Sequence, residues 1–179
     1  METLIQKHTL KDYRRLPEGA PYQLIDGELV MSPAPKTKHQ IISGRINRKL
    51  DLTAQGKGLV LYAPVDVYLD EENVYQPDIL FLSNAKMSRL KEDGIYGAPN
   101  MVIEILSPST AYYDLKTKFQ VYQKAGVAEY WIVDPELQTI ELFVNTGQGL
   151  ILKQKIKTEG QINSSVLAGF ALVWEELFD

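Results

Sequence analysis

The chain of 179 residues is 45% hydrophobic and 23% charged, which is typical of one globular domain, so we predict a single domain over residues 1–179. It contains no cysteine, which excludes disulfides, zinc fingers, iron–sulfur clusters and cysteine nucleophiles. The net charge of −4 argues against nucleic-acid binding over the whole surface, so phosphate contacts would need a local basic patch. No apolar run approaches the ~18 residues of a membrane span and the N-terminus lacks a signal-peptide layout, so we expect a cytoplasmic protein with no membrane partner.

The first third of the chain is predicted to form a short helix, a hairpin and a long helix. The dipeptide Asp26-Gly27 stands between two apolar runs, which is a strong signal for a β-hairpin. Ile42, Ile46 and Leu50 recur at the spacing of one buried helix face. The predicted elements are a helix over residues 10–15, strands over 22–25 and 28–31, and a helix over 38–54.

Two nearly continuous apolar runs, residues 79–82 and 101–106, dominate the rest of the chain. Such runs are typical of strands that are buried on both faces of a sheet. The predicted elements are strands over residues 59–62, 65–69, 74–82 and 101–106, a helix over 111–124, a strand over 129–133, and an antiparallel pair over 139–144 and 150–157. This order predicts an α/β (α+β) fold in which helices flank a mixed β-sheet.

Two carboxylates interrupt this apolar pattern. Glu104 stands between Ile103 and Ile105 in one predicted strand, and Asp78 begins another. Burying an isolated carboxylate costs several kcal/mol, or raises its pKa until it is neutral. A hard divalent cation such as Mg²⁺ takes oxygen ligands and often only one or two carboxylates. Asp78 and Glu104 on neighbouring strands therefore indicate a metal site.

Each carboxylate also has an ordinary structural interpretation. Asp78 follows Pro77 and could cap a turn or a strand end. Glu104 could lie in water at the end of its strand, near Ser107. Both interpretations stay open from the residues alone, although two such carboxylates together favour the metal site.

The helix predicted over residues 111–124 carries a candidate cationic group. Asp114 and Lys118 are four residues apart and therefore share one helix face. The predicted core stripe consists of Leu115, Phe119 and Tyr122, and Lys118 lies about 60° away from it. Lys118 could therefore reach the end of the sheet with its ammonium group. The alternative is a lysine whose stem covers the core while its ammonium group stays in water.

A basic stretch precedes these elements, since residues 29–50 contain no aspartate or glutamate. Its basic side chains could form a local positive strip for DNA in an otherwise acidic protein. The alternative is a solvated helix face. The candidate nucleic-acid contacts in this stretch are Lys36, Lys38, His39, Arg45 and Arg48.

Several of these motifs occur together in a known family. The shared segments are Gln-Pro-Asp-Ile at residues 76–79, the run 99–110, the helix segment 114–118, the run 126–135, and, near the N-terminus, Asp-Gly-Glu at 26–28, Ser-Pro-Ala-Pro at 32–35 and His39. The chain resembles the Uma family of restriction-endonuclease-like proteins, formerly catalogued as a domain of unknown function. The resemblance covers nearly the whole chain and is strongest from residue 76 to residue 135.

The resemblance implies a restriction-endonuclease-like fold and a PD-(D/E)XK nuclease site. Pro77-Asp78 matches the first half of that pattern and Glu104 the second, but Leu106 stands where the pattern has lysine. The family comparison places Lys118 in the role of that lysine. It also implies that Glu28 is an additional acidic group and a further metal ligand.

The implied chemistry is hydrolysis of DNA phosphodiester bonds with Mg²⁺ or Mn²⁺ bound by Asp78 and Glu104. Lys118 would orient the attacking water or stabilise the developing charge, and Asp114 would orient Lys118 or support the metal. Cutting both strands of a duplex usually takes two sites, so we expect a homodimer.

The alternative function is that of a catalytically inactive nuclease-fold protein that binds nucleic acid or a protein partner, which the missing lysine at position 106 favours. Hydrolysis of sugars by paired carboxylates is a third and weaker hypothesis, because the sequence lacks convincing aromatic platforms for a sugar.

Overall fold

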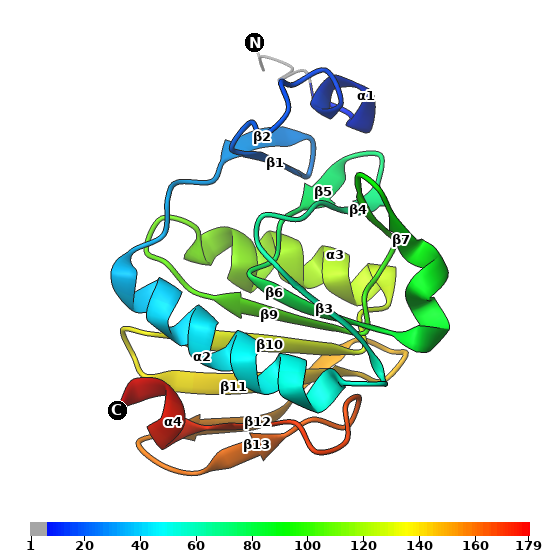
Figure 1. Cartoon of the computed structure of the whole chain (residues 1–179). Helices are drawn as coiled ribbons and strands as arrows, with labels where there is room; N and C mark the ends of the chain where they lie inside the picture. Colours follow the sequence, from blue (N-terminus) through cyan, green and yellow to red (C-terminus); the bar gives the residue numbers. More distant parts are fainter. Residues whose placement is uncertain (1–6) are drawn as a thin grey trace.

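The computed structural model describes residues 7–179, which form two six-stranded sheets and a small two-stranded sheet (Figure 1). The helices are α1 (Leu10–Tyr13), α2 (Thr37–Ala54), α3 (Lys118–Ala125) and α4 (Trp174–Phe178), with a 3-10 turn η1 (Asn84–Arg89) and a π-helical turn η2 (Tyr113–Thr117). Within these residues, no helix is both long enough and apolar enough to cross a membrane.

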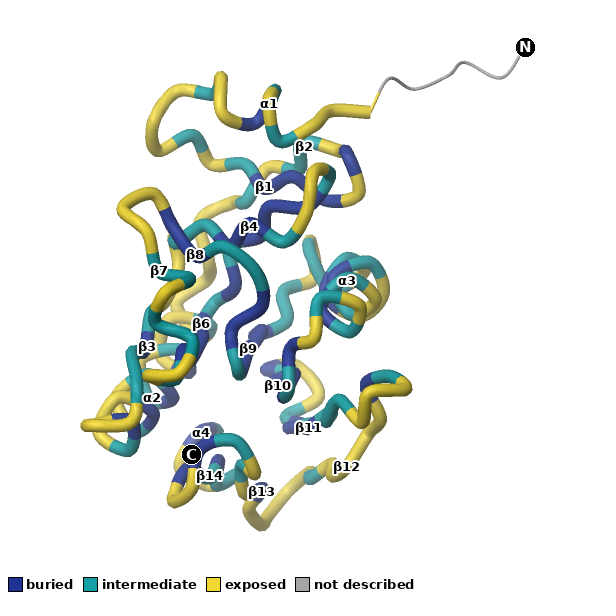
Figure 2. The backbone as a smooth tube through the Cα atoms, turned by 90° about the vertical axis from the view of Figure 1, so that its right-hand side faces the viewer, coloured by how far each residue is buried: buried dark blue, intermediate teal, exposed yellow. Residues whose placement is uncertain are grey.

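The larger body of the molecule is a mixed sheet with the strand order β12-β11-β10-β9-β6-β3. These strands are β3 (Gly58–Tyr62), β6 (Ile79–Ser83), β9 (Met101–Ile105), β10 (Glu129–Asp134), β11 (Thr139–Asn145) and β12 (Leu150–Lys157). Strands β9 and β10 are parallel, and their neighbours run antiparallel to them. The helices α2 and α3 lie on opposite faces of this sheet, as Figures 1 and 2 show together. The predicted mixed sheet flanked by helices is thereby confirmed.

Strand β9 is buried along its whole length because it lies between these two helices (Figure 2). Met101, Ile103 and Ile105 pack in the core beneath α2, together with Ile42, Ile46 and Leu50 of that helix. Val102 packs on the other side, in the core that contains Tyr122 of α3. Because side chains alternate along a strand, Glu104 points toward α3.

A second sheet covers one end of the molecule, with the strand order β2-β1-β5-β4-β8-β7. These strands are β1 (Tyr22–Ile25), β2 (Glu28–Met31), β4 (Val67–Asp70), β5 (Asn73–Tyr75), β7 (Leu90–Lys91) and β8 (Gly94–Tyr96). The predicted hairpin is confirmed as β1 and β2, joined through Asp26 and Gly27, which both have positive φ.

The prediction of one strand over residues 74–82 was wrong. Strand β5 belongs to the second sheet and β6 to the larger one, so the chain passes from one sheet to the other at residues 76–78. Pro77 lacks the N–H group that a continuous ladder would need at this point. Asp78 therefore stands where the two sheets meet.

The helix predicted over residues 111–124 is also interrupted. The turn η2 is π-helical and continues directly into α3, which ends at Ala125 and is capped by Gly126 with φ +85°. A π turn contains an extra residue and so rotates the side chains that follow it. Consequently Leu115, predicted in the core, is 47% exposed, whereas Asp114, Lys118 and Tyr122 are buried.

The C-terminal segment adds β13 (Gln161–Asn163), β14 (Ala171–Val173) and α4, which packs against α2. Glu129, at the start of β10, joins this segment to the larger sheet. Its fully buried carboxylate accepts hydrogen bonds from Trp131 Nε1, Ser164 Oγ, both the backbone N–H and the hydroxyl of Ser165, and the N–H of Val166, at 2.6–3.2 Å.

Candidate active site

Asp78 immediately precedes β6 and lies beside the last residues of β9. Its Oδ2 atom accepts a 2.7 Å hydrogen bond from the backbone N–H of Ile105. Its own N–H points to Glu104 Oε2 at 3.3 Å, just beyond the last paired residues of the two strands, Ile79 and Ile103. The end of the β6–β9 ladder therefore brings the two predicted carboxylates together.

Glu104 is buried beneath α3, with 3% of its side chain exposed. Its Oε1 atom accepts hydrogen bonds from Lys118 Nζ at 3.1 Å and from the Tyr122 hydroxyl at 3.0 Å. Tyr122 was expected only as a core residue, and its hydroxyl contact could not be predicted from helical spacing. The structural alternative of a solvated Glu104 was wrong, because the strand continues to Ile105 in the interior.

Lys118 completes this group from the first position of α3. Its ammonium lies 3.1 Å from Glu104 Oε1 and 2.9 Å from Asp114 Oδ1, and only 4% of its side chain is exposed. The alternative of a lysine with its head in water was therefore wrong. Lys118 is held between two carboxylates at the end of the sheet, as its position on the helix predicted.

His39 of α2 reaches the same place from the opposite face of the sheet. Its Nε2 lies 3.2 Å from Asp78 Oδ2. This contact brings His39, in the first turn of α2, into the group around Asp78. Burial lowers the pKa of His39, but the hydrogen bond and the negative charge of Asp78 outweigh it, so the pKa is raised. This partnership favours the protonated imidazole.

The cluster contains three acidic side chains, Asp78, Glu104 and Asp114, but only two basic ones, His39 and Lys118. Burial raises the pKa of the Glu104 carboxyl to about 8, although the ammonium of Lys118 opposes this shift. Burial also lowers the pKa of Lys118, but Glu104 and Asp114 outweigh it and raise the pKa above its ordinary value. The cluster therefore retains a positive lysine and favours one additional positive charge, from a proton or a metal ion.

These groups open into a cavity of about 720 Å³ between the two large sheets. Asp78, Glu104, Asp114 and Lys118 form its floor, and the N-terminal part of α2 forms one wall. Ser107 and Thr110 line it as well, with their hydroxyl oxygens 2.8 Å apart. The cavity is therefore bordered by the three carboxylates and by the Lys118 ammonium.

A family model described as "Uma2: Putative restriction endonuclease" matches residues 10–175 of this chain. The chain belongs to the Uma2 family. Its fold is similar to the crystal structure of a "putative nuclease belonging to DUF820" from Anabaena variabilis, with a TM-score of 0.79. That match covers 95% of this chain and 97% of the other, at 22% sequence identity, and shows the restriction-endonuclease-like fold. The comparison with curated proteins gave no match.

In this Uma2 protein, Glu28 does not join the predicted metal ligands. It is exposed at the turn end of β2, opposite Ile25, and does not line the cavity. Ser32, just beyond the other end of β2, does line it. At ~3.3 Å per residue, Glu28 lies about 13 Å along the strand from Ser32. The hairpin register thus separates Glu28 from the carboxylates, and Gln23 on β1 takes the place beside the cavity.

The basic stretch of the Uma2 chain does not form one continuous strip. Lys36 and His39 line the cavity, but Lys38 donates to the carbonyl of Pro135 instead. Arg45 donates to the carbonyl of Leu177, the last buried residue of α4, at 3.0 Å. The basic side chains on successive turns of α2 contact different parts of the molecule. The prediction that they form one positive strip was therefore wrong.

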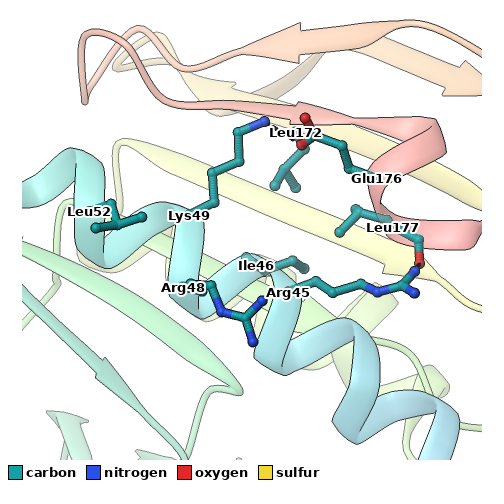
Figure 3. Close-up of a pocket in the computed structure, with 8 residues that line it drawn as sticks. All are labelled: Arg45, Ile46, Arg48, Lys49, Leu52, Leu172, Glu176 and Leu177. Atoms are coloured by element: carbon teal, nitrogen blue, oxygen red, sulfur yellow. Dashed lines mark hydrogen bonds and ion pairs between the residues drawn. The ribbon is translucent and has the colours of Figure 1, made fainter.

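The remaining basic side chains of that stretch line a smaller cavity of about 360 Å³ between α2 and α4 (Figure 3). Arg45, Arg48 and Lys49 line it, and Lys49 forms an ion pair with Glu176. Arg45 and Lys49 are thus engaged with α4 and lie apart from Asp78. Arg48 is exposed and does not line the larger cavity.

The donor set of the Uma2 site suits a hard cation with few protein ligands. Within residues 7–179, no three histidine, aspartate or glutamate side chains converge into a ligand set. Asp78 and Glu104 supply two carboxylates, as Mg²⁺ sites that retain several waters require. In the same part of the chain, the buried His39 Nδ1 has no hydrogen-bond partner, whereas Asp114 Oδ1 is ion-paired with the Lys118 ammonium at 2.9 Å. An unpartnered buried nitrogen beside Asp78 fits a site that holds ordered water.

Proposed function

We propose that this protein is a divalent-metal-dependent endonuclease that hydrolyses phosphodiester bonds in DNA. The observation that carries the proposal is the meeting of Asp78, Glu104 and Lys118 at one end of the sheet, on the floor of an accessible cavity. Asp78 and Glu104 would hold Mg²⁺ or Mn²⁺. When bound, such an ion lowers the pKa of water and neutralises charge on phosphate oxygens.

The remaining residues have distinct roles in this proposal. Lys118 provides a fixed positive charge beside Glu104, where it orients the attacking water or stabilises negative charge that develops on the phosphate. Asp114 orients the Lys118 ammonium. His39 holds one oxygen of Asp78, as does the N–H of Ile105, and both contacts fix the orientation of that carboxylate.

Calorimetric titration of Mg²⁺ and Mn²⁺, with plasmid cleavage measured in parallel, tests this function. We expect Asp78→Asn and Glu104→Gln to abolish metal binding and to reduce cleavage by more than the ~10–100-fold that loss of a supporting residue costs. Glu28→Gln is the matched control and should leave both properties unchanged, because Glu28 lies outside the cavity. Wild-type protein that binds neither ion at millimolar concentration in the presence of DNA would contradict the proposal.

Binding of DNA without cleavage would support the alternative, an inactive nuclease-fold protein, which the leucine at position 106 favours. A homodimer is the expected state if both strands of a duplex are cut. Sedimentation or light scattering in the presence and absence of DNA tests that expectation.

The raised pKa of Glu104 predicts how stability depends on pH. Because this pKa rises from 4.5 to about 8 on folding, the folded state binds the proton more tightly than the unfolded state. The stability that protonated Glu104 contributes is fully present below pH 4.5 and is lost as the pH rises toward 8. In metal-free protein, the free energy of unfolding from urea titrations should therefore fall between pH 5 and pH 8. The fall should be smaller in Glu104→Gln, and equal slopes in the two proteins would contradict the assignment.

A further inference from the structure

Tyr62 presents an unpartnered aromatic ring beside the proposed metal ligands. It is the last residue of β3, lines the larger cavity and is 60% exposed. Tyr62 pairs with Ile79, the residue that follows Asp78. The backbone N–H of Ala63, the residue after Tyr62, donates a hydrogen bond to the carbonyl of Asp78. Among residues 7–179, Tyr62 has neither an aromatic neighbour nor a hydrogen-bond partner for its hydroxyl. Any of the nucleobases can stack on such a ring, because each has a flat aromatic face.

The charges that line the cavity do not suit a double helix lying across it. Proteins that grip duplex DNA through its backbone often neutralise six or more phosphates, roughly, with lysine and arginine. Here Lys118 and His39 are already paired with Glu104 and Asp78. Among the lysine and arginine residues that line the cavity in the described part of the chain, Lys36 alone has no acidic partner.

The walls of the cavity offer neutral polar groups and rigid apolar surfaces instead. Lys36, His39, Gln40 and Ser43 follow one another at helical spacing along the α2 wall, so one helix face combines a positive charge with amide and hydroxyl groups. Five of the nine prolines also line the cavity, namely Pro21, Pro33, Pro35, Pro64 and Pro108. Because proline fixes φ, these walls are preformed. Such a lining matches an unpaired base, which has a flat apolar face and a polar edge.

From these observations we infer that the cavity binds single-stranded nucleic acid, with one unpaired base stacked on Tyr62 and the adjacent phosphate directed toward Asp78 and Glu104. This inference rests on the proposed function for the position of the reacting phosphate and adds the form of the substrate. A volume of about 720 Å³ suits a short unpaired segment, since pockets for small organic ligands span ~300–1,000 Å³. A strand that is bound singly needs only one site for each cut.

Fluorescence anisotropy with a fluorescein-labelled single-stranded 12-mer, and with the same 12-mer annealed to its complement, tests this inference. The titrations are made in Ca²⁺ buffer and repeated in EDTA, so that binding is measured without cleavage. We expect wild-type protein to bind the single strand more tightly than the duplex. Tyr62→Ala should weaken single-strand binding about tenfold, whereas Tyr62→Phe, which retains the ring, should bind as wild type does.

Tyr112→Ala is the matched control, because Tyr112 is 63% exposed but does not line the cavity. It should leave binding unchanged. Equal affinity for single strand and duplex, or unchanged binding by Tyr62→Ala, would overturn the inference. Cleavage is then measured with Mg²⁺ in place of Ca²⁺. Single-strand binding that depends on Tyr62 but leads to no cleavage would overturn the proposed function alone. Cleavage of the duplex that Tyr62→Ala leaves unchanged would overturn the inference alone.

Discussion

Lys118→Met is expected to lower the free energy of unfolding by about 3–5 kcal/mol, the usual cost of removing one partner from a buried ion pair. The methionine side chain fills a similar volume but leaves Glu104 and Asp114 without the ammonium that lies within 3.1 Å of both. Urea unfolding of metal-free protein at pH 8.5 measures this loss. Cleavage should fall by at least about 100-fold, as it does when a group that stabilises transition-state charge is removed.

Lys155→Met provides the control for this experiment. Lys155 forms an ion pair with Glu141 on the surface of the larger sheet, with 48% of the lysine side chain exposed. Its removal should cost less than about 1 kcal/mol. If Mg²⁺ occupies the site, it should stabilise Lys118→Met more than wild type, because it replaces part of the missing positive charge. A loss of stability in Lys118→Met no larger than in the control would contradict the buried ion pair.

Glu129→Ala is expected to destabilise the protein by a similar amount without acting on the proposed site. Removal of its carboxylate leaves several donors of Trp131, Ser164, Ser165 and Val166 without an acceptor. Each buried donor left unsatisfied costs about 1–3 kcal/mol, and partial relaxation should hold the total near 3–5 kcal/mol. Urea unfolding measures the total, and the metal affinity of the folded fraction should remain that of wild type.

Glu141→Ala is the matched variant on the adjacent strand, since Glu141 makes a single ion pair, with the half-exposed Lys155. Its expected cost is below about 1 kcal/mol. Equal stability of the two variants would show that the contacts of Glu129 do not hold the C-terminal segment. A loss of metal binding in folded Glu129→Ala would show that this segment and the site are coupled.

Hydrophobic periodicity was sufficient to predict most of the larger sheet and α2. Ile42, Ile46 and Leu50 fall on one helix face, and the continuous apolar runs became the buried strands β6 and β9. Periodicity could not show that β5 and β6 belong to different sheets, because both are buried and only residues 76–78 separate them. Nor did it predict β13, β14 and α4, which are short and are held by contacts distant in sequence, such as those of Glu129.

The site was predictable where a carboxylate interrupted an apolar strand. Asp78 and Glu104 stood out for this reason, and the structure places them together. Little in the sequence indicated the contact between His39 and Asp78, because this contact depends on how α2 packs against the sheet. Glu28 was misplaced since sequence motifs report which residues occur and not how far a hairpin extends from the cavity.

The π turn η2 has a consequence for how related sequences should be compared. Its extra residue sets the rotation that directs Asp114, Lys118 and Tyr122 inward and leaves Leu115 outside. A relative lacking one residue between Ser107 and Lys118 would restore a regular helix and turn its lysine by about 100° away from the glutamate. Such a protein would retain every residue of the motif in an alignment and still lack the site, so the length of this segment is as diagnostic as its composition.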